Sequence, residues 1–306
     1  YDAVFFFNLA IWGGKIGRIL NIPTFASGTP YVYSREMIDK YPLEFAEKVL
    51  KNANTSGRSV KRFLNMCNLQ LWSKFPDLKD LSVTTNYSGS GDINFIYTST
   101  QFQLHPELID DKKNLFVGII MSDNDFPDCS QLFDPQRKNI FVSLGTVFNN
   151  IAVYDLCIVC LRKLNYNVII NIGMANSEGD FEEMPEEWHV GAMFPQLQIL
   201  RNIDLFITHG GANSAREAAY FGVPMIVFPQ SSDQFLAGKD IERNGLGVVF
   251  EKAVTVEELT VAVKETISDK ELQERCKALS GKMQSLGGID QVVEVIENKV
   301  KEWKNE

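Results

Sequence analysis

The chain has 306 residues, of which 45% are hydrophobic and 23% charged, a composition typical of a globular protein with room for two domains. Its net charge of −9 argues against a nucleic-acid partner and against binding to an anionic membrane surface. The five cysteines follow no disulfide spacing, so we expect a reducing compartment and a cytoplasmic protein.

The first residues predict an α/β domain that begins inside a strand. Residues 1–7 form the first expected strand, residues 13–20 a helix and residues 22–26 the next strand. The longest apolar stretch, residues 4–12, is too short to span a bilayer. Because the chain starts inside a strand, we expect a fragment that lacks its N-terminal segment.

Residues 31–84 are mostly polar and predict a helical region. Four apolar residues there are expected in a core or a pocket wall: Leu64, Leu69, Leu71 and Trp72. A loop at residues 86–92 precedes strands at residues 93–98 and 115–120. The acidic stretch Ser122–Asp128 predicts an interdomain linker, and its carboxylates lack the spacing of a calcium loop.

The second half predicts a doubly wound parallel sheet, because strands and helices alternate from residue 139 onwards. The expected strands lie at residues 140–144, 168–172, 188–192, 205–208, 225–228 and 248–250, with a helix at residues 151–164. Cys157-x-x-Cys160 falls in that apolar helix and has no second pair for zinc, which favours core packing.

Three features mark the helices at the end of the chain. Thr255-x-x-Glu258 and Ser268-x-x-Glu271 have the spacing of capping boxes. The last helix carries an apolar stripe at helical spacing, consisting of Ile289, Val292, Val293, Ile296, Val300 and Trp303. The stripe fits packing on the N-terminal domain and packing on its own domain equally well.

One stretch in the second half is the strongest candidate for a functional site. A buried strand, residues 205–208, ends at His209-Gly-Gly, and a helical run opens at Asn213. The free amides at a helix start favour an anion, most often phosphate. A second strand, residues 225–228, leads into the polar loop Ser231-Ser-Asp-Gln234. Since ligands bind at the carboxyl ends of such strands, we predict a phosphate cradle beside a hydroxyl-binding loop.

Structural explanations exist for each of these residues taken alone. Ser214-x-x-Glu217 has capping-box spacing, and Asn213 and His209 fit ordinary turn residues. Their conjunction favours a ligand site, because a helix cap does not call for His, paired Gly, Asn and a downstream Asp-Gln together. A lipase-type oxyanion loop is rejected, because the chain has no G-x-S-x-G nucleophile elbow.

The segment HGGANSAREAAYFGVPMIVFPQSSDQ closely resembles the donor-site signature of nucleotide-sugar-dependent (UDP-) glycosyltransferases with the GT-B fold, and the soluble macrolide-type branch is the nearest match. Three further marks of that family follow in order: Phe141-Val-Ser-Leu-Gly-Thr146, Phe194-Pro-Gln-Leu-Gln-Ile-Leu200 and Gly245-Leu-Gly-Val. The resemblance implies an α/β protein of two Rossmann-like doubly wound domains, the N-terminal one incomplete. The implied parts are an acceptor domain at 1–121, a linker at 122–138, a donor domain at 139–288 and a helix at 289–306 that crosses back toward the N-terminal domain.

The resemblance also implies roles for individual residues. The diphosphate would be held by His209, Gly211, Asn213 and Ser214, and the sugar hydroxyls by Asp233 and Gln234. The carboxylate of Glu217 would take the ribose hydroxyls. The loop with Ser143, Gly145 and Thr146 would lie near the diphosphate and the transferred sugar. Gln196, with backbone groups of Phe194, would read a uracil or thymine edge, and Met193 stands where relatives often carry a base-stacking Trp.

The activity implied is transfer of a hexose, with inversion, from a UDP-glucose-like donor to a hydroxyl of a small apolar acceptor. No metal and no further cofactor is expected. In this family the general base is a histidine, which would lie upstream of Tyr1. Its orienting aspartate would fall near Phe7, where Asn8 is the candidate orienter. A nucleotide-sugar-binding subunit that relies on a partner chain is the alternative, and a sugar-nucleotide epimerase fits the motifs less well.

Overall fold

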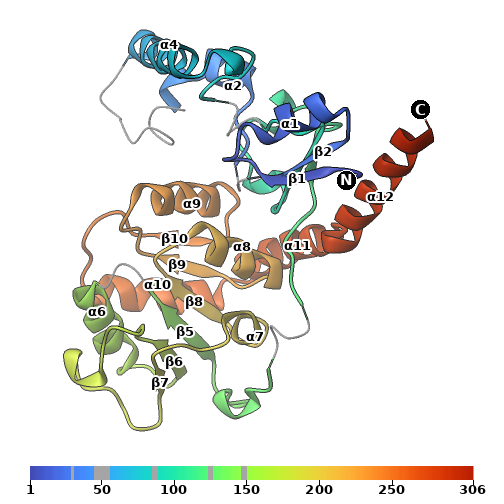
Figure 1. Ribbon diagram of the computed structural model, residues 1–306. Coiled ribbons are helices and arrows are strands. Elements are labelled where there is room, and N and C mark those ends of the chain that lie inside the picture. The colour runs from blue at the N-terminus through green and yellow to red at the C-terminus, as the bar shows by residue number, and fades with distance from the viewer. Residues whose placement is uncertain (29–30, 45–55, 85–88, 123–126, 146–149, 306) are drawn as a thin grey trace. The chain divides into compact units, whose positions relative to one another are not determined.

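The computed structural model describes residues 1–28, 31–44, 56–84, 89–122, 127–145 and 150–305 (Figure 1). It divides into two compact units, one of Tyr1–Ile120 with Leu286–Glu306 and the other of Met121–Ser285. Residues 86–88 of the expected loop and residues 123–126 of the expected linker lie outside the described residues. Within these ranges, every helix is too short or too polar to cross a bilayer.

The first unit holds a four-stranded parallel sheet in the order β1-β2-β3-β4. The strands are β1 (Val4–Phe7), β2 (Thr24–Ser27), β3 (Ile93–Ile96) and β4 (Asn114–Phe116). Helix α1 (Gly13–Leu20) has the predicted bounds and ends at Asn21, which adopts the left-handed conformation with φ 53°. The four predicted strands are therefore confirmed, with ends shifted by a few residues.

The polar region between β2 and β3 is helical as predicted. It contains α2 (Arg35–Lys40), α4 (Gly57–Lys74) and the 3-10 turn η1 (Pro76–Leu78). Two more 3-10 turns, η2 (Thr100–Phe102) and η3 (Pro106–Leu108), lie between β3 and β4. A further one, η5 (Ser130–Leu132), belongs to the second unit. Leu64 is buried in a core with Val60, as expected. Leu69 is 64% exposed and lines, with Leu71, a surface pocket of about 690 Å³, so it belongs to the predicted pocket wall and not to the core.

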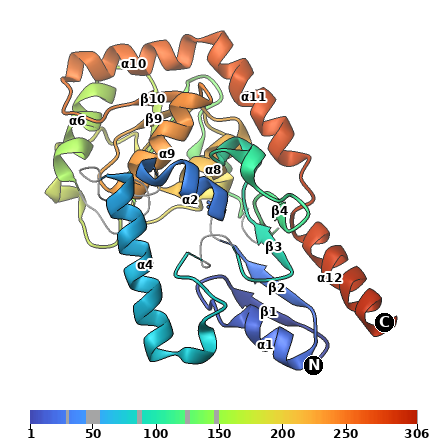
Figure 2. The same ribbon diagram turned by 90° about the horizontal axis from the view of Figure 1, so that it is seen from above.

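Helix α12 (Gly288–Asn305) packs on the sheet of the first unit (Figure 2). Its buried face joins a core with Phe25, Phe95 and Val117 and consists of Val292, Val295, Ile296 and Val300. Ile289 and Val293, two members of the predicted stripe, are nearly half exposed. The predicted apolar stripe therefore included two residues too many, because only one narrower face of α12 packs on the sheet.

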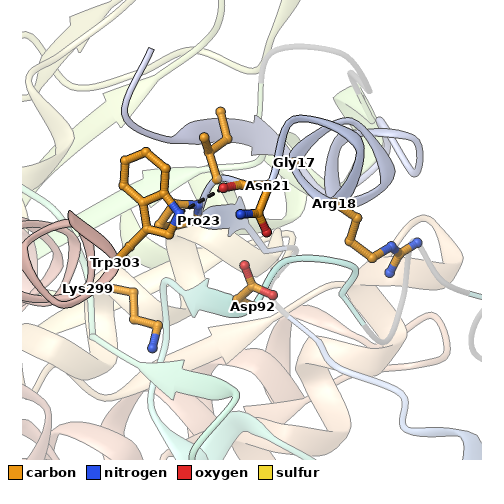
Figure 3. Close-up of a pocket in the computed structure, with 8 residues that line it drawn as sticks. Gly17, Arg18, Asn21, Pro23, Asp92, Lys299 and Trp303 are labelled. Carbon is orange, nitrogen blue, oxygen red and sulfur yellow. Dashed lines mark hydrogen bonds between the residues drawn. The ribbon is translucent and has the colours of Figure 1, made fainter. Parts of the chain in front are cut away.

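Two polar contacts fasten the end of α12. The indole Nε1 of Trp303 donates to the carbonyl of Asn21 at 2.8 Å, and Lys304 pairs with Asp2 at 2.6 Å. Figure 3 shows the indole beside a pocket of about 200 Å³ that Asp92 and Lys299 also line. All the residues that line this pocket belong to the first unit.

The second unit holds a six-stranded parallel sheet in the order β10-β9-β8-β5-β6-β7. Its strands are β5 (Asn139–Ser143), β6 (Asn167–Asn171), β7 (His189–Gly191), β8 (Leu205–Thr208), β9 (Met225–Val227) and β10 (Gly247–Val249). The helices are α6 (Ile151–Leu161), α7 (Gln196–Leu200), α8 (Ala212–Phe221), α9 (Ser232–Arg243), α10 (Val256–Ser268) and α11 (Lys270–Gln284), with a 3-10 turn η6 (Glu178–Asp180). This is the doubly wound sheet that the sequence predicts.

The core of the second unit explains the C-x-x-C motif. Cys157 and Cys160 are fully buried in α6, which packs with α10 against the sheet. Burial raises the pKa of both thiols above its ordinary value. The interpretation as core residues is confirmed.

Of the two predicted capping boxes, one is formed. Thr255 and Glu258 cap α10 reciprocally, with the Thr255 N–H 2.7 Å from the Glu258 carboxylate. The box at Ser268 was wrong, because the hydroxyl of Ser268 donates back to the carbonyl of Lys264. Asp269 caps α11 instead, accepting from the amide of Leu272 at 3.0 Å.

Candidate functional site

The donor-signature residues gather at the point where the second sheet reverses its order. Strands β5, β6 and β7 extend to one side and β8, β9 and β10 to the other. Right-handed crossovers therefore place α6 and α8 on opposite faces, and the carboxyl ends of β5 and β8 mark the switch point at which such sheets bind ligands. In that pair Ser143 is in register with Thr208, so the turns that follow the two strands are neighbours.

The imidazole of His209 fills the space between these two turns. A Cβ on Gly145 would lie 2.9 Å from its Cε1, and a Cβ on Gly211 would lie 2.7 Å from its Nε2. Gly145 also has a φ of +92°, which favours glycine. The structure thus brings together three predicted residues, while Thr146 lies outside the described residues.

Helix α8 begins with free backbone amides next to this histidine. Its N-cap is Gly211, which provides no side-chain cap. The capping-box explanation of Ser214 and Glu217 is therefore wrong, since both residues already lie inside the helix. The first amides of α8, which include those of Asn213 and Ser214, have no acceptor within the helix, and the helix dipole favours an anion there.

Gln196 contacts the same helix from α7. Its Nε2 donates to the Glu217 carboxylate at 2.6 Å and to the Ser214 hydroxyl at 3.1 Å. Three residues that the resemblance implies in nucleoside and phosphate binding are therefore joined in one network. The network directs the amide hydrogens of Gln196 toward α8.

Phe194 precedes α7, and its ring lies against the backbone of Gly191. A Cβ on Gly191 would meet the Phe194 ring at 2.9 Å, so glycine at the end of β7 makes room for it. Met193 is 66% exposed beside it. A flexible thioether thus occupies an open position next to the candidate nucleoside site.

The polar loop after β9 is organised by Gln234. Its side chain is 4% exposed, and its Oε1 accepts from the amides of Gln230 and Ser231 at 2.7 and 3.1 Å. Ser231 and Gln234 form a capping box that opens α9. The oxygen of Gln234 is therefore used to build the loop, and the side chain of Asp233 lies outside the described residues.

Two residues that the sequence did not single out support the turn after β5. The hydroxyl of Tyr154 accepts from the amide of Leu144 at 3.1 Å and donates to the carbonyl of Asn171 at 2.6 Å. The Asn171 side chain donates to the hydroxyl of Ser143 at 3.3 Å. Burial raises the pKa of Tyr154 to about 12, so the phenol stays protonated at neutral pH. Only the position of Tyr154 in an otherwise apolar helix hinted at this role.

Two histidines lie outside the donor signature, His105 in the first unit and His189 in the second. His105, in the first unit, lies 2.9 Å from the Glu44 carboxylate and stacks on Tyr41 at a centroid distance of 3.9 Å. His189 begins β7. Asn8, the candidate orienter, is buried just after β1 and donates its backbone N–H to Ser27. Within the described ranges, no three His, Cys, Asp or Glu side chains are grouped as metal ligands.

The chain is similar in sequence to known glycosyltransferases. Residues 156–298 match the family model described as "Erythromycin biosynthesis protein CIII-like, C-terminal domain". An uncharacterized UDP-glucosyltransferase of Bacillus subtilis, YojK, is 26% identical over 98% of this chain and 74% of its own length. The NDP-glycosyltransferase YjiC of the same organism is 33% identical over 67% of this chain, which spans about half of that relative, 53%.

Solved structures agree with this comparison at the level of the fold. The crystal structure of the kitacinnamycin glycotransferase superposes with a TM-score of 0.77 at 23% identity, over 97% of this chain and 76% of that protein. The fold is thus the α/β GT-B fold. Together with the matched motifs at the switch point, these similarities show that the chain belongs to the macrolide-type glycosyltransferase family.

Proposed function

We propose that this chain carries the donor site of a glycosyltransferase that moves a hexose from a UDP-sugar to a hydroxyl of a small apolar acceptor. The observation that supports this most is the junction of Gln196, Ser214 and Glu217 beside His209. The free amides of α8 and His209 would hold the diphosphate, Glu217 the ribose, and Asp233 with Gln234 the sugar. No metal or further cofactor enters the proposal.

The proposed reaction proceeds with inversion. The acceptor hydroxyl gives its proton to a basic histidine, its oxygen bonds to the anomeric carbon, and the bond from that carbon to the nucleoside diphosphate breaks. Charge that builds up on the departing diphosphate is stabilised by the helix start and by His209, which are fixed before the reaction begins. Asn8 is the proposed orienter of the basic histidine.

A second candidate is a nucleotide-sugar-binding subunit that receives its base from a partner chain. It is favoured by one observation: His105 is already engaged with Glu44 and Tyr41, and His209 is wedged at the donor site. Under this alternative the chain binds nucleotide sugars alone and transfers only when the partner is present.

Release of UDP from UDP-glucose, with and without a hydroxylated aromatic acceptor, tests the proposal. Glu217→Ala and His209→Ala should each reduce release by about tenfold or more, because each removes a contact to a charged or hydroxyl-rich group. Glu257→Ala, an exposed change on α10, is the control and should leave release unchanged. Unaltered release in both site variants would refute the proposed donor site.

A further inference from the structure

The side-chain amide of Gln196 has only one orientation that satisfies its neighbours. Its nitrogen lies 2.6 Å from Oε2 of Glu217 and 3.1 Å from Oγ of Ser214. A carboxylate can only accept hydrogen bonds, so the reversed amide would place two acceptors 2.6 Å apart. The chemistry of Glu217 therefore determines which end of the amide faces α8.

This orientation leaves Gln196 with a single group to offer a ligand. Its amide nitrogen is directed at two acceptors on α8, one turn apart in the helix. Only the carbonyl oxygen remains for a nucleotide. A glutamine that reads a uracil or thymine edge would use its donor and its acceptor together, and the donor is used elsewhere here.

We propose, on the basis of the donor site proposed above, that Gln196 is a positioning residue that orients Glu217 toward the ribose and does not read the base. The short contact fixes the rotation of the Glu217 side chain. A carboxylate has about four lone-pair positions, so the bond from Gln196 leaves it able to accept from ribose hydroxyls. The second contact ties α7 to Ser214, in the first turn of α8.

The assignment predicts that recognition of the ribose, and not of the base, depends on Gln196. UDP and 2′-deoxy-UDP differ only in the ribose 2′-hydroxyl, so their affinity ratio reports on recognition of the ribose. UDP and CDP differ only at the base edge, so their ratio reports on recognition of the base. A residue that orients Glu217 governs the first ratio, and a residue that reads the base governs the second.

Calorimetric titration of the three nucleotides into wild type and Gln196→Met tests the proposal. Methionine keeps the length of the side chain but cannot donate a hydrogen bond to Glu217. Wild type should bind UDP about tenfold or more tighter than 2′-deoxy-UDP, the loss expected when a hydrogen bond to a charged group is missing. In Gln196→Met this ratio should fall toward one, while the ratio of UDP to CDP stays at its wild-type value.

Two further variants make the test independent of a local folding defect. Glu217→Gln keeps the side-chain size and should also abolish the preference for the 2′-hydroxyl. Gln284→Ala is the matched control, because Gln284 also donates to α8, at the carbonyl of Tyr220 and 3.0 Å away, but at the opposite end of the helix. It should leave both ratios unchanged.

The contrary results are equally clear. Loss of the UDP preference over CDP in Gln196→Met, with the preference for the 2′-hydroxyl intact, would assign Gln196 to the base and overturn the proposal. Binding by wild type without any preference for the 2′-hydroxyl would overturn this assignment alone. Failure of wild type to bind any of the three nucleotides would overturn the proposed function itself, and this assignment with it.

Discussion

The imidazole Nε2 of His209 lies 2.7 Å from the position that a Cβ on Gly211 would occupy. The three atoms nearest to that position all belong to this one ring. Because Gly145 approaches the ring from the turn after β5, the histidine joins the ends of β5 and β8. The position of the ring therefore depends on the absence of side chains at Gly145 and Gly211 as much as on the side-chain torsions of His209.

Gly211→Ala should displace the ring of His209 and weaken nucleotide binding. The φ of Gly211 is −55°, which any residue adopts, so the cost comes from the contact with the imidazole. We expect a loss of about 1–3 kcal/mol in the free energy of unfolding, as for other overpacked sites. Urea denaturation measures it, and the loss should shrink in a His209→Ala background, where the ring is absent.

Gly281→Ala is the control for that substitution. Gly281 lies inside α11, and a Cβ there would meet nothing within 4 Å. Alanine should stabilise the helix by about 0.5–1 kcal/mol, because glycine loses more backbone entropy on folding. Equal destabilisation by both substitutions would show that the effect at Gly211 does not come from His209.

Tyr154→Phe should destabilise the second unit, since it leaves the Leu144 amide and the Asn171 carbonyl without their side-chain partner. A loss of about 1–3 kcal/mol in the free energy of unfolding is expected at neutral pH. The check is chemical denaturation followed by tryptophan fluorescence. A variant as stable as wild type would mean that the hydroxyl does not support the turn after β5.

The same phenol makes stability depend on alkaline pH. Burial raises the pKa of Tyr154 to about 12, and an unfolded tyrosine titrates near 10. The native state thus holds its proton more tightly, so the stabilisation is complete below pH about 10 and is lost as the pH rises toward 12. Between pH about 10 and about 12, the free energy of unfolding should fall less steeply with pH for Tyr154→Phe than for wild type. The same pH dependence of the unfolding free energy in both proteins would contradict the burial of the phenol.

Asp269→Ala and Ser268→Ala distinguish the observed cap of α11 from the one predicted. Asp269 accepts from the Leu272 amide, and its loss should cost about 1 kcal/mol of stability. The hydroxyl of Ser268 only returns to carbonyls of its own helix, so its loss should cost less than about 0.5 kcal/mol. A larger loss of stability for Ser268→Ala than for Asp269→Ala in urea denaturation would support the capping box predicted at Ser268.

Val292→Ala tests the packing of α12 on the first unit. Val292 is 4% exposed in a core with Phe25 and Phe95, and its truncation should cost about 1–3 kcal/mol. Val293 is 47% exposed on the same helix, so Val293→Ala is the matched control. Hydrogen exchange should accelerate in β2 and β3 for the first variant only. Acceleration confined to the second unit would contradict the assignment of α12.

Much of the second unit was predictable because its strands are short apolar runs bounded by glycine and polar residues. Strand β8 has the predicted bounds, since Thr208 is followed at once by His209 and two glycines. Helix starts were harder, because Ser214 and Asp269 both have side chains that can cap. Only the backbone geometry decided that Gly211 begins α8 and Asp269 begins α11.

Contacts between distant segments could not be predicted from the sequence. Gln196 and Glu217 are 21 residues apart, and their bond depends on how α7 packs beside α8. The packing of His209 against Gly145 likewise depends on the pairing of β5 with β8. The sequence places Leu69 in a core or a pocket wall, but it could not show that this side of α4 stays exposed.

The most direct test of the donor site is an equilibrium titration of this chain with UDP, paired with Glu217→Ala. The account predicts saturable binding by wild type and its loss in the variant, with the unfolding transition of the variant unchanged. A chain that melts cooperatively and binds neither UDP nor dTDP would contradict it, as would undiminished binding of UDP by Glu217→Ala.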